Sequence, residues 1–170
     1  SLSINVNNPA DATTWSQQVL PDHVTEIRIT GFFDALQFPQ KLTLLELDSS
    51  GNLLQQDFQH LPPTLKKLHL HRVSPSLTPE VVKSLPKLRS LTMTRVEPFG
   101  AEWVRAGLPE TLTCLDLLPH YSWSNESLAL LPRGLRSVNI SKLKKLNDQG
   151  IALLPPHLTT LNASGSRYIT

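Results

Sequence analysis

The sequence predicts a repeat protein of the α/β class, a solenoid in which about eight short units stack along one axis. A Leu-Pro or Phe-Pro pair recurs along the chain, and each pair precedes apolar residues in the spacing L-x-x-L-x-L. The first apolar residues of these runs lie in steps of 18, 23, 23, 24, 23 and 23 residues, at Val24, Leu42, Leu65, Leu88, Leu112, Leu135 and Leu158. Repeats of about 20 to 50 residues are the sequence signature of solenoids.

Composition excludes several classes of protein. Charged residues make up 18% of the 170 residues and hydrophobic ones 39%, which is unlike a disordered tail or a membrane protein. The net charge of +2 is too small to indicate binding to nucleic acid or to a membrane. Cys114 is the single cysteine, so no internal disulfide can form. These features, with no signal segment at the start, favour an intracellular location.

Each unit is expected to supply one strand to a single array that covers residues 1–170. The apolar residues of the strand point into a core shared with neighbouring units, each worth roughly 1.5–3 kcal/mol when fully buried. A step of 23 residues back from Val24 places Ile4 and Val6 in the apolar slots of a first unit. The strands are expected near residues 3–6, 26–29, 44–47, 67–70, 90–93, 114–117, 137–140 and 160–163.

The segments between strands predict short helices and turns. Proline lacks a backbone N–H and has a fixed φ, so each Leu-Pro pair marks the corner where the chain enters the next strand. Helices are expected in `TPEVVKSL`, `GAEWVRAGL`, `SNESLALL` and `NDQGIALL`. Thr78, Asn125 and either Asn147 or Asp148 are the expected caps. The 18-residue unit with `GFFDALQ` is too short for a full helix and predicts a tight turn.

The unit L-P-x-x-L-x-x-L-x-L resembles those of the leucine-rich repeat superfamily over essentially the whole chain. The resemblance implies a curved parallel sheet on the concave side and short helices and turns on the convex side. The asparagine that often follows the strand in that family is absent, so no asparagine ladder is expected there. `SLSINV` and `SGSRYIT` look like parts of units. We therefore expect further repeats or domains beyond both ends.

Strand residues alternate between faces, so the residue between the last two apolar positions points to the concave side. This row reads Asn5, Arg28, Glu46, His69, Thr92, Asp116, Asn139 and Asn162. Mixed charges and small hydroxyl and amide groups suit a protein or peptide partner better than a deep small-molecule pocket. The predicted binding residues are Arg28, Glu46, Asp48, Lys67, His69, His71, Arg72, Thr92, Asp116, Leu118, Tyr121, Asn139 and Asn162.

Two charged groups of residues each allow two interpretations. Glu46, Asp48, His69 and His71 should form a two-by-two patch, which is either a zinc site or two cross-strand charge contacts. We assign no metal and no cofactor. Basic residues around this patch either attract an acidic partner or keep the array soluble. They are Lys66, Lys67, Arg72, Arg89 and Arg95.

`LPHYSW`, from Leu118 to Trp123, departs from the repeat. Aromatic anchors dominate many interfaces, so this segment is a predicted contact site. The alternative is that Trp123 packs on the convex layer beside Trp103. Phe58, Phe99 and Trp15 are expected to fill the convex layer.

Cys114 lacks a neighbouring base and is interpreted as an ordinary small residue. The tripeptides at Asn125, Asn139 and Asn162 match the N-glycosylation pattern, although glycans on the last two would obstruct the concave face.

The sequence shows no phosphate loop, acid–base pair or nucleophile constellation, so we predict a non-enzymatic module that binds a protein partner through its concave sheet. No nucleic acid or membrane partner is expected. Two alternatives remain open. In the first alternative, the array is the substrate-recognition or regulatory region of a larger enzyme or effector, such as a ubiquitin ligase. In the second, it is a structural subunit of a large assembly.

Overall fold

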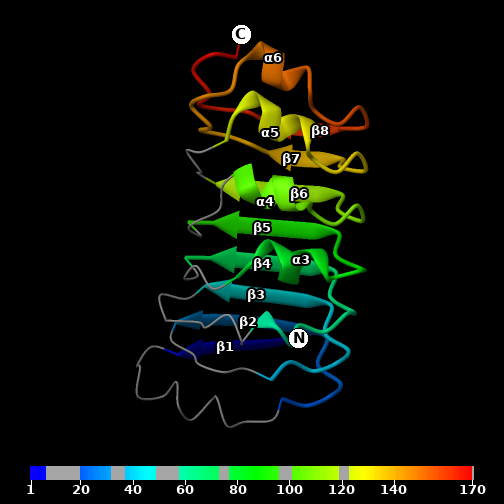
Figure 1. The fold of residues 1–170 in the computed structure, drawn as a ribbon. Helices are drawn as coiled ribbons and strands as arrows, with labels where there is room; N and C mark the ends of the chain where they lie inside the picture. The colour runs from blue at the N-terminus through cyan, green and yellow to red at the C-terminus, as the bar shows by residue number, and fades with distance from the viewer. Residues whose placement is uncertain are drawn as a thin grey trace.

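The eight strands form one parallel sheet in chain order. The computed structural model describes residues 1–6, 20–31, 37–48, 58–72, 77–95, 101–118 and 123–169. The strands are β1 (Leu2–Val6), β2 (Glu26–Gly31), β3 (Leu44–Asp48), β4 (Lys67–His71), β5 (Ser90–Thr94), β6 (Cys114–Leu118), β7 (Ser137–Asn139) and β8 (Thr160–Asn162). Each begins within one residue of its expected position. Figure 1 shows them stacked from β1 to β8 along the molecule.

Within the described residues, four short helices follow the same stack (Figure 1). They are α3 (Pro79–Lys83), α4 (Ala101–Ala106), α5 (Asn125–Ala129) and α6 (Asp148–Ile151), and each contacts the next. All four lie within the segments predicted to be helical. The tight turn predicted around `GFFDALQ` falls on residues 32–36, outside the described residues.

The helix caps agree with the prediction only in part. The Asn147 side chain caps α6, where it accepts hydrogen bonds from the backbone N–H groups of Gln149 and Gly150 at 3.1 and 3.3 Å. The cap predicted for α5 was wrong, because α5 starts after Ser124 and Asn125 is its first residue. Thr78 is the N-cap of α3, but its side chain makes no capping hydrogen bond.

The predicted interior rows are confirmed. Leu45, Leu68, Leu91 and Leu115 pair in register across four strands and are fully buried. A second row runs Ile29, Leu47, Leu70, Met93, Leu117. The first row continues through Val138 to Leu161, which is 41% exposed because β8 has no further strand beside it in the sheet. Burial of these rows depends on the stacking of neighbouring strands.

The register predicted for the first unit was wrong by two residues. Leu2 and Ile4, rather than Ile4 and Val6, pair with Ile27 and Ile29. A shift of two keeps every side chain on its expected face, since strand side chains alternate. The observed register lets Leu2 pack against the core as well as Ile4.

Each Leu-Pro or Phe-Pro pair forms the corner that leads into a strand. In most units the proline carbonyl accepts the N–H of the residue three positions later, as in Leu65 to Pro62 at 3.0 Å and Leu112 to Pro109 at 3.0 Å. The unit at Leu85 is one residue shorter at this point, and there the Leu85 carbonyl accepts from Leu88 at 3.3 Å. The proline therefore starts a turn immediately before the strand.

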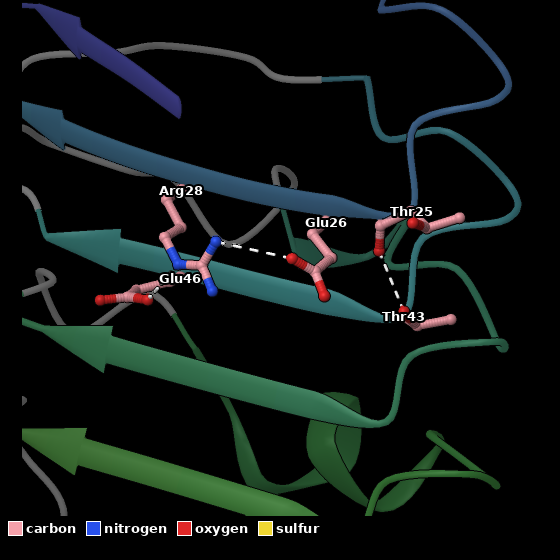
Figure 2. A network of polar contacts seen from close by, with 5 residues as sticks. All are labelled: Thr25, Glu26, Arg28, Thr43 and Glu46. Carbon is pink, nitrogen blue, oxygen red and sulfur yellow. Dashed lines mark hydrogen bonds and ion pairs between the residues drawn. The ribbon is translucent and has the colours of Figure 1, made fainter. Parts of the chain in front are cut away.

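One residue per unit links the corners to one another. We call this set the corner column. Its members are Thr25, Thr43, Lys66, Arg89, Thr113, Arg136 and Thr159. The carbonyl of each accepts two N–H groups from the next unit, at 2.8–3.2 Å, until the series ends at Thr159. Threonine hydroxyls add to the ladder, as where Thr43 Oγ1 donates to the Thr25 carbonyl at 3.0 Å (Figure 2).

Candidate functional site

The sheet face opposite the buried rows carries polar side chains from every strand, and we call it the open face. Its middle row pairs Arg28, Glu46, His69, Thr92, Asp116, Asn139 and Asn162 in register. The shift of β1 places Ser3 next to Arg28, so Asn5, predicted to lie there, pairs with Thr30. The other seven members of the row lie where the sequence places them.

Charges on β2 and β3 are paired with one another. The Arg28 Nε atom donates to Glu46 Oε2 at 3.1 Å, and Arg28 Nη1 lies 3.6 Å from Glu26 Oε2. Figure 2 shows the guanidinium of Arg28 between these two carboxylates. The positive charge of Arg28 is therefore largely neutralised by carboxylates of the same chain. A hollow of about 340 Å³, lined in part by Ser3, Arg28 and Glu46, opens at this end of the face.

The four residues weighed as a zinc site do meet as two register pairs, Glu46 with His69 and Asp48 with His71. Their carboxylates, however, pair with arginines. Arg28 holds Glu46, and Arg72 Nη2 lies 2.8 Å from Asp48 Oδ1. Within the described ranges no group of three or more His, Cys, Asp or Glu side chains is placed to hold a metal ion. The geometry favours cross-strand charge contacts.

The basic residues predicted to surround this patch lie at two different edges of the sheet. Lys66, Lys67 and Arg89 lie where strands begin, whereas Arg72 and Arg95 follow the ends of β4 and β5. The two arginines adopt positive φ angles of 53° and 54°. That conformation costs a residue with a side chain roughly 1–2 kcal/mol. A strand of five residues separates the two edges, so the five residues form no single patch.

The surroundings of His69 on the open face change its pKa. Partial burial, together with the neighbouring His71, Lys67 and Arg28, lowers the pKa of His69 below its usual value, although Glu46 opposes this. Burial disfavours the charged imidazolium because it removes water from around it. The lowered pKa favours the neutral imidazole of His69 over the cation.

Asp116 carries a polar atom that the fold leaves unsatisfied. Its Oδ1 atom is enclosed and has no hydrogen-bond partner within the described residues, although the rest of the side chain is partly exposed. Burial raises the pKa of Asp116, against a hydrogen bond from Asn139 and the nearby His69 and His71. Asn139 is oriented for that bond, because its Oδ1 accepts from the Ser141 N–H at 3.2 Å. An enclosed carboxylate oxygen without a donor costs stability.

We predict that Asp116→Asn stabilises the fold at pH 7 by about 0.5–1 kcal/mol, because a neutral amide costs less to enclose than a charge. Folding raises the Asp116 pKa, so the folded chain binds more protons than the unfolded chain between the ordinary Asp range and the raised value. Stability of the wild type therefore falls as pH rises through that window. Urea unfolding of both proteins at pH 7 and near pH 4 tests this. A difference that does not shrink at the lower pH contradicts it.

The aromatic contact site was wrong for Trp123. This side chain is 1% exposed and belongs to the hydrophobic core together with Trp103, as the alternative interpretation held. Leu118 ends β6 in register with Thr94. The Leu118 side chain and Tyr121 lie outside the described residues. Phe58 is buried as expected, whereas Phe99 and Trp15 also lie outside the described part of the chain.

Two further predictions concern single residues. Cys114 is a free, half-buried cysteine that pairs in register with Ser90 and Ser137. The side-chain oxygens of Asn139 and Asn162 each accept the N–H two residues later, at 3.2 and 3.1 Å. These bonds hold both amides on the open face.

Sequence reasoning missed an asparagine pair on the helical side of the stack. Asn125 Nδ2 donates to Asn147 Oδ1 at 2.7 Å, and the Asn147 N–H donates back to Asn125 Oδ1 at 3.3 Å. A glycan on Asn125 would break this contact. The available signal was the repeat itself, since the two asparagines stand one unit apart at the starts of consecutive helices.

Comparisons with known proteins add no family to this description. No model of a known protein family matches the chain, and no curated protein matches it. Among the described residues, no helix is both long and apolar enough to cross a membrane.

Proposed function

We propose that the chain is a leucine-rich repeat module that binds a protein partner through the open face and has no catalytic activity of its own. The near-constant spacing of 23 residues and the single in-register sheet support the family assignment. In this proposal the open face is the concave side of the array. Stacked repeats of this kind present their strands side by side as an extended surface, which is suited to binding a partner.

The extent and polarity of the open face are the observation that carries the proposal. From β5 to β8 its side chains are small and mostly neutral, including Ser90, Thr92, Ser137 and Asn139. Such groups leave a broad surface that offers many hydrogen bonds. Protein interfaces have this polar character, whereas small-molecule sites are usually enclosed and mostly apolar.

The placement of the titratable groups supports a non-enzymatic role. His69 and Asp116, whose pKa values are shifted, lie on β4 and β6 with Thr92 on the strand between them. Strands are about 4.8 Å apart, so roughly 10 Å separates the two backbones. A nucleophile and the base that activates it lie within hydrogen-bond reach of each other, about 2.6–3.2 Å between heavy atoms, so these two residues do not form such a pair.

A pair of bulky charged substitutions on the open face tests the proposal. We expect Thr92→Arg with Ser137→Arg to remove the proteins that the immobilised wild-type chain retains from a cell extract, by steric blockage of β5 and β7. Quantitative mass spectrometry of the retained proteins provides the readout. At least one partner should fall about tenfold or more, which corresponds to roughly 1.4 kcal/mol.

Gln149→Arg with Ala152→Arg is the matched control, since both residues are exposed at α6 and the added charge is the same. Melting temperatures of both variants must stay near that of the wild type. If every retained protein survives the open-face substitutions, or if the control removes the same proteins, the open face is not the binding surface.

A further inference from the structure

Basic side chains gather at the corners that lead into strands β3 to β8. The segments 37–43, 61–67, 85–90, 108–114, 131–137 and 154–160 form this edge, which we call the corner edge. It contains seven lysines and arginines and a single acidic residue, Glu110, all of them exposed. The seven are Lys41, Lys66, Lys67, Lys87, Arg89, Arg133 and Arg136. The chain as a whole has a net charge of only +2, so its positive charge is strongly concentrated here.

The corner edge is held rigid by its own backbone. Lys66, Arg89 and Arg136 belong to the corner column, whose carbonyl groups each accept two N–H groups of the next unit. The backbone N–H of Arg89 donates to the Lys66 carbonyl at 2.8 Å, so these two basic residues occupy equivalent positions in adjacent units. The backbone positions that carry these charges are therefore fixed in a line. Preorganisation reduces the entropy lost on binding.

Ion pairing differs between the open face and the corner edge. On the open face Arg28 contacts both Glu46 and Glu26. At the corner edge none of the seven basic side chains has an ion-pair partner within the described part of the chain, and Lys66 and Arg89 are like charges on adjacent units. Neighbouring like charges destabilise a sheet slightly. An anionic partner would offset that cost.

We infer that the corner edge docks an acidic polypeptide segment of the partner. This inference rests on the proposed function, because the corner edge is the rim of the open face. Lys67 itself begins β4 and lies in the row that faces the open side. A hollow of about 180 Å³ lined by Glu26, Thr43, Leu44, Lys66 and Lys67 lies where the two surfaces meet.

Two observations favour an acidic polypeptide over a nucleic acid. The only Phe, Tyr or Trp in the corner segments is Phe38, which is buried, so the exposed imidazole of His157 is the only ring in these segments on which a base can stack. The distance also suits a short peptide. Four strand spacings of about 4.8 Å lie between the units of Lys41 and Arg136, which is roughly the length of six extended residues.

Fluorescence anisotropy with labelled octaglutamate and the purified chain tests the inference. We expect binding at about 20 mM salt that weakens steeply by 200 mM, because salt screens exposed charges. Lys66→Ala with Arg89→Ala should weaken binding about tenfold, since each lost exposed pair contributes up to about 1 kcal/mol. Arg105→Ala with Lys145→Ala removes the same charge elsewhere and should change binding less than about twofold.

A gain-of-function variant keeps the test decisive if the alanine variant is unstable. Glu110→Lys should tighten octaglutamate binding several-fold, whereas Glu102→Lys on α4 should not. No binding at low salt, or equal effects of the corner and control variants, overturns the inference. Tighter binding of an eight-nucleotide oligothymidylate, also lost in the corner variant, would instead assign the edge to nucleic acid. None of these outcomes decides whether the open face binds a partner, because the Thr92→Arg and Ser137→Arg experiment tests that separately.

Discussion

Leu91→Ala is expected to destabilise the protein by about 3–4 kcal/mol, whereas Leu161→Ala should cost less than about 1 kcal/mol. Both leucines occupy the same interior row, but Leu91 is fully buried between Leu68 and Leu115 while Leu161 is 41% exposed on β8. Removal of the Leu91 side chain leaves a cavity that the neighbouring strands cannot fill. Urea unfolding followed by circular dichroism measures both changes.

The pair of leucines forms an internal control because the chemical change is identical and only the burial differs. Equal losses of stability at the two positions would mean that the row is not a shared core. A variant of Leu91 that is already unfolded at 25 °C would agree with the expectation. In that case Leu91→Val offers a milder measure, and its cost should again exceed that of Leu161→Val.

Gly150→Ala is expected to destabilise the protein by about 2 kcal/mol, although alanine normally favours a helix over glycine. A Cβ atom at Gly150 would overlap Asn125 Oδ1 and lie 2.9 Å from Asn125 Cγ. The Asn125 side chain would have to move, and both hydrogen bonds between Asn125 and Asn147 would be lost. Thermal or urea unfolding at pH 7 measures the effect.

Gly134→Ala is the matched control, because a Cβ there meets nothing closer than the Glu110 carbonyl oxygen at 3.4 Å. Its effect should stay within about 0.5 kcal/mol or be slightly stabilising. Asn125→Ala removes the obstacle at Gly150. In that background Gly150→Ala should cost at least about 1 kcal/mol less than in the wild type. Equal costs in the two backgrounds would disprove the clash with Asn125.

Much of the fold could be predicted from the sequence because the same pattern of corner and buried residues recurs in each unit. Seven Leu-Pro or Phe-Pro corners and seven apolar runs place β2 to β8 in register, and their burial follows. The first unit was misplaced by two residues because it precedes the first Leu-Pro pair. Without that marker, Leu2 and Ile4 fit the apolar slots as well as Ile4 and Val6.

The candidate site was predictable in its rows but not in its contacts. Alternation of side chains places Arg28, Glu46 and His69 together from sequence alone. Which of these side chains form ion pairs depends on their rotamers and on the paths of the loops. The sequence therefore did not predict the ion pair between Arg72 and Asp48. Trp123 was misassigned for a similar reason, since the segment before it breaks the repeat and its direction cannot be read from spacing.

The sequence by itself determined the period of the units, the faces of the strands and the rows that fill the core, because side-chain alternation and a fixed repeat length are properties of the chain. Only the tertiary structure decided which charges neutralise one another and which remain unpaired. Stacking brings residues 18 to 25 positions apart to about 4.8 Å, and the five-residue strands separate the basic residues into two edges. The concentration of positive charge at the corner edge is a product of that stacking.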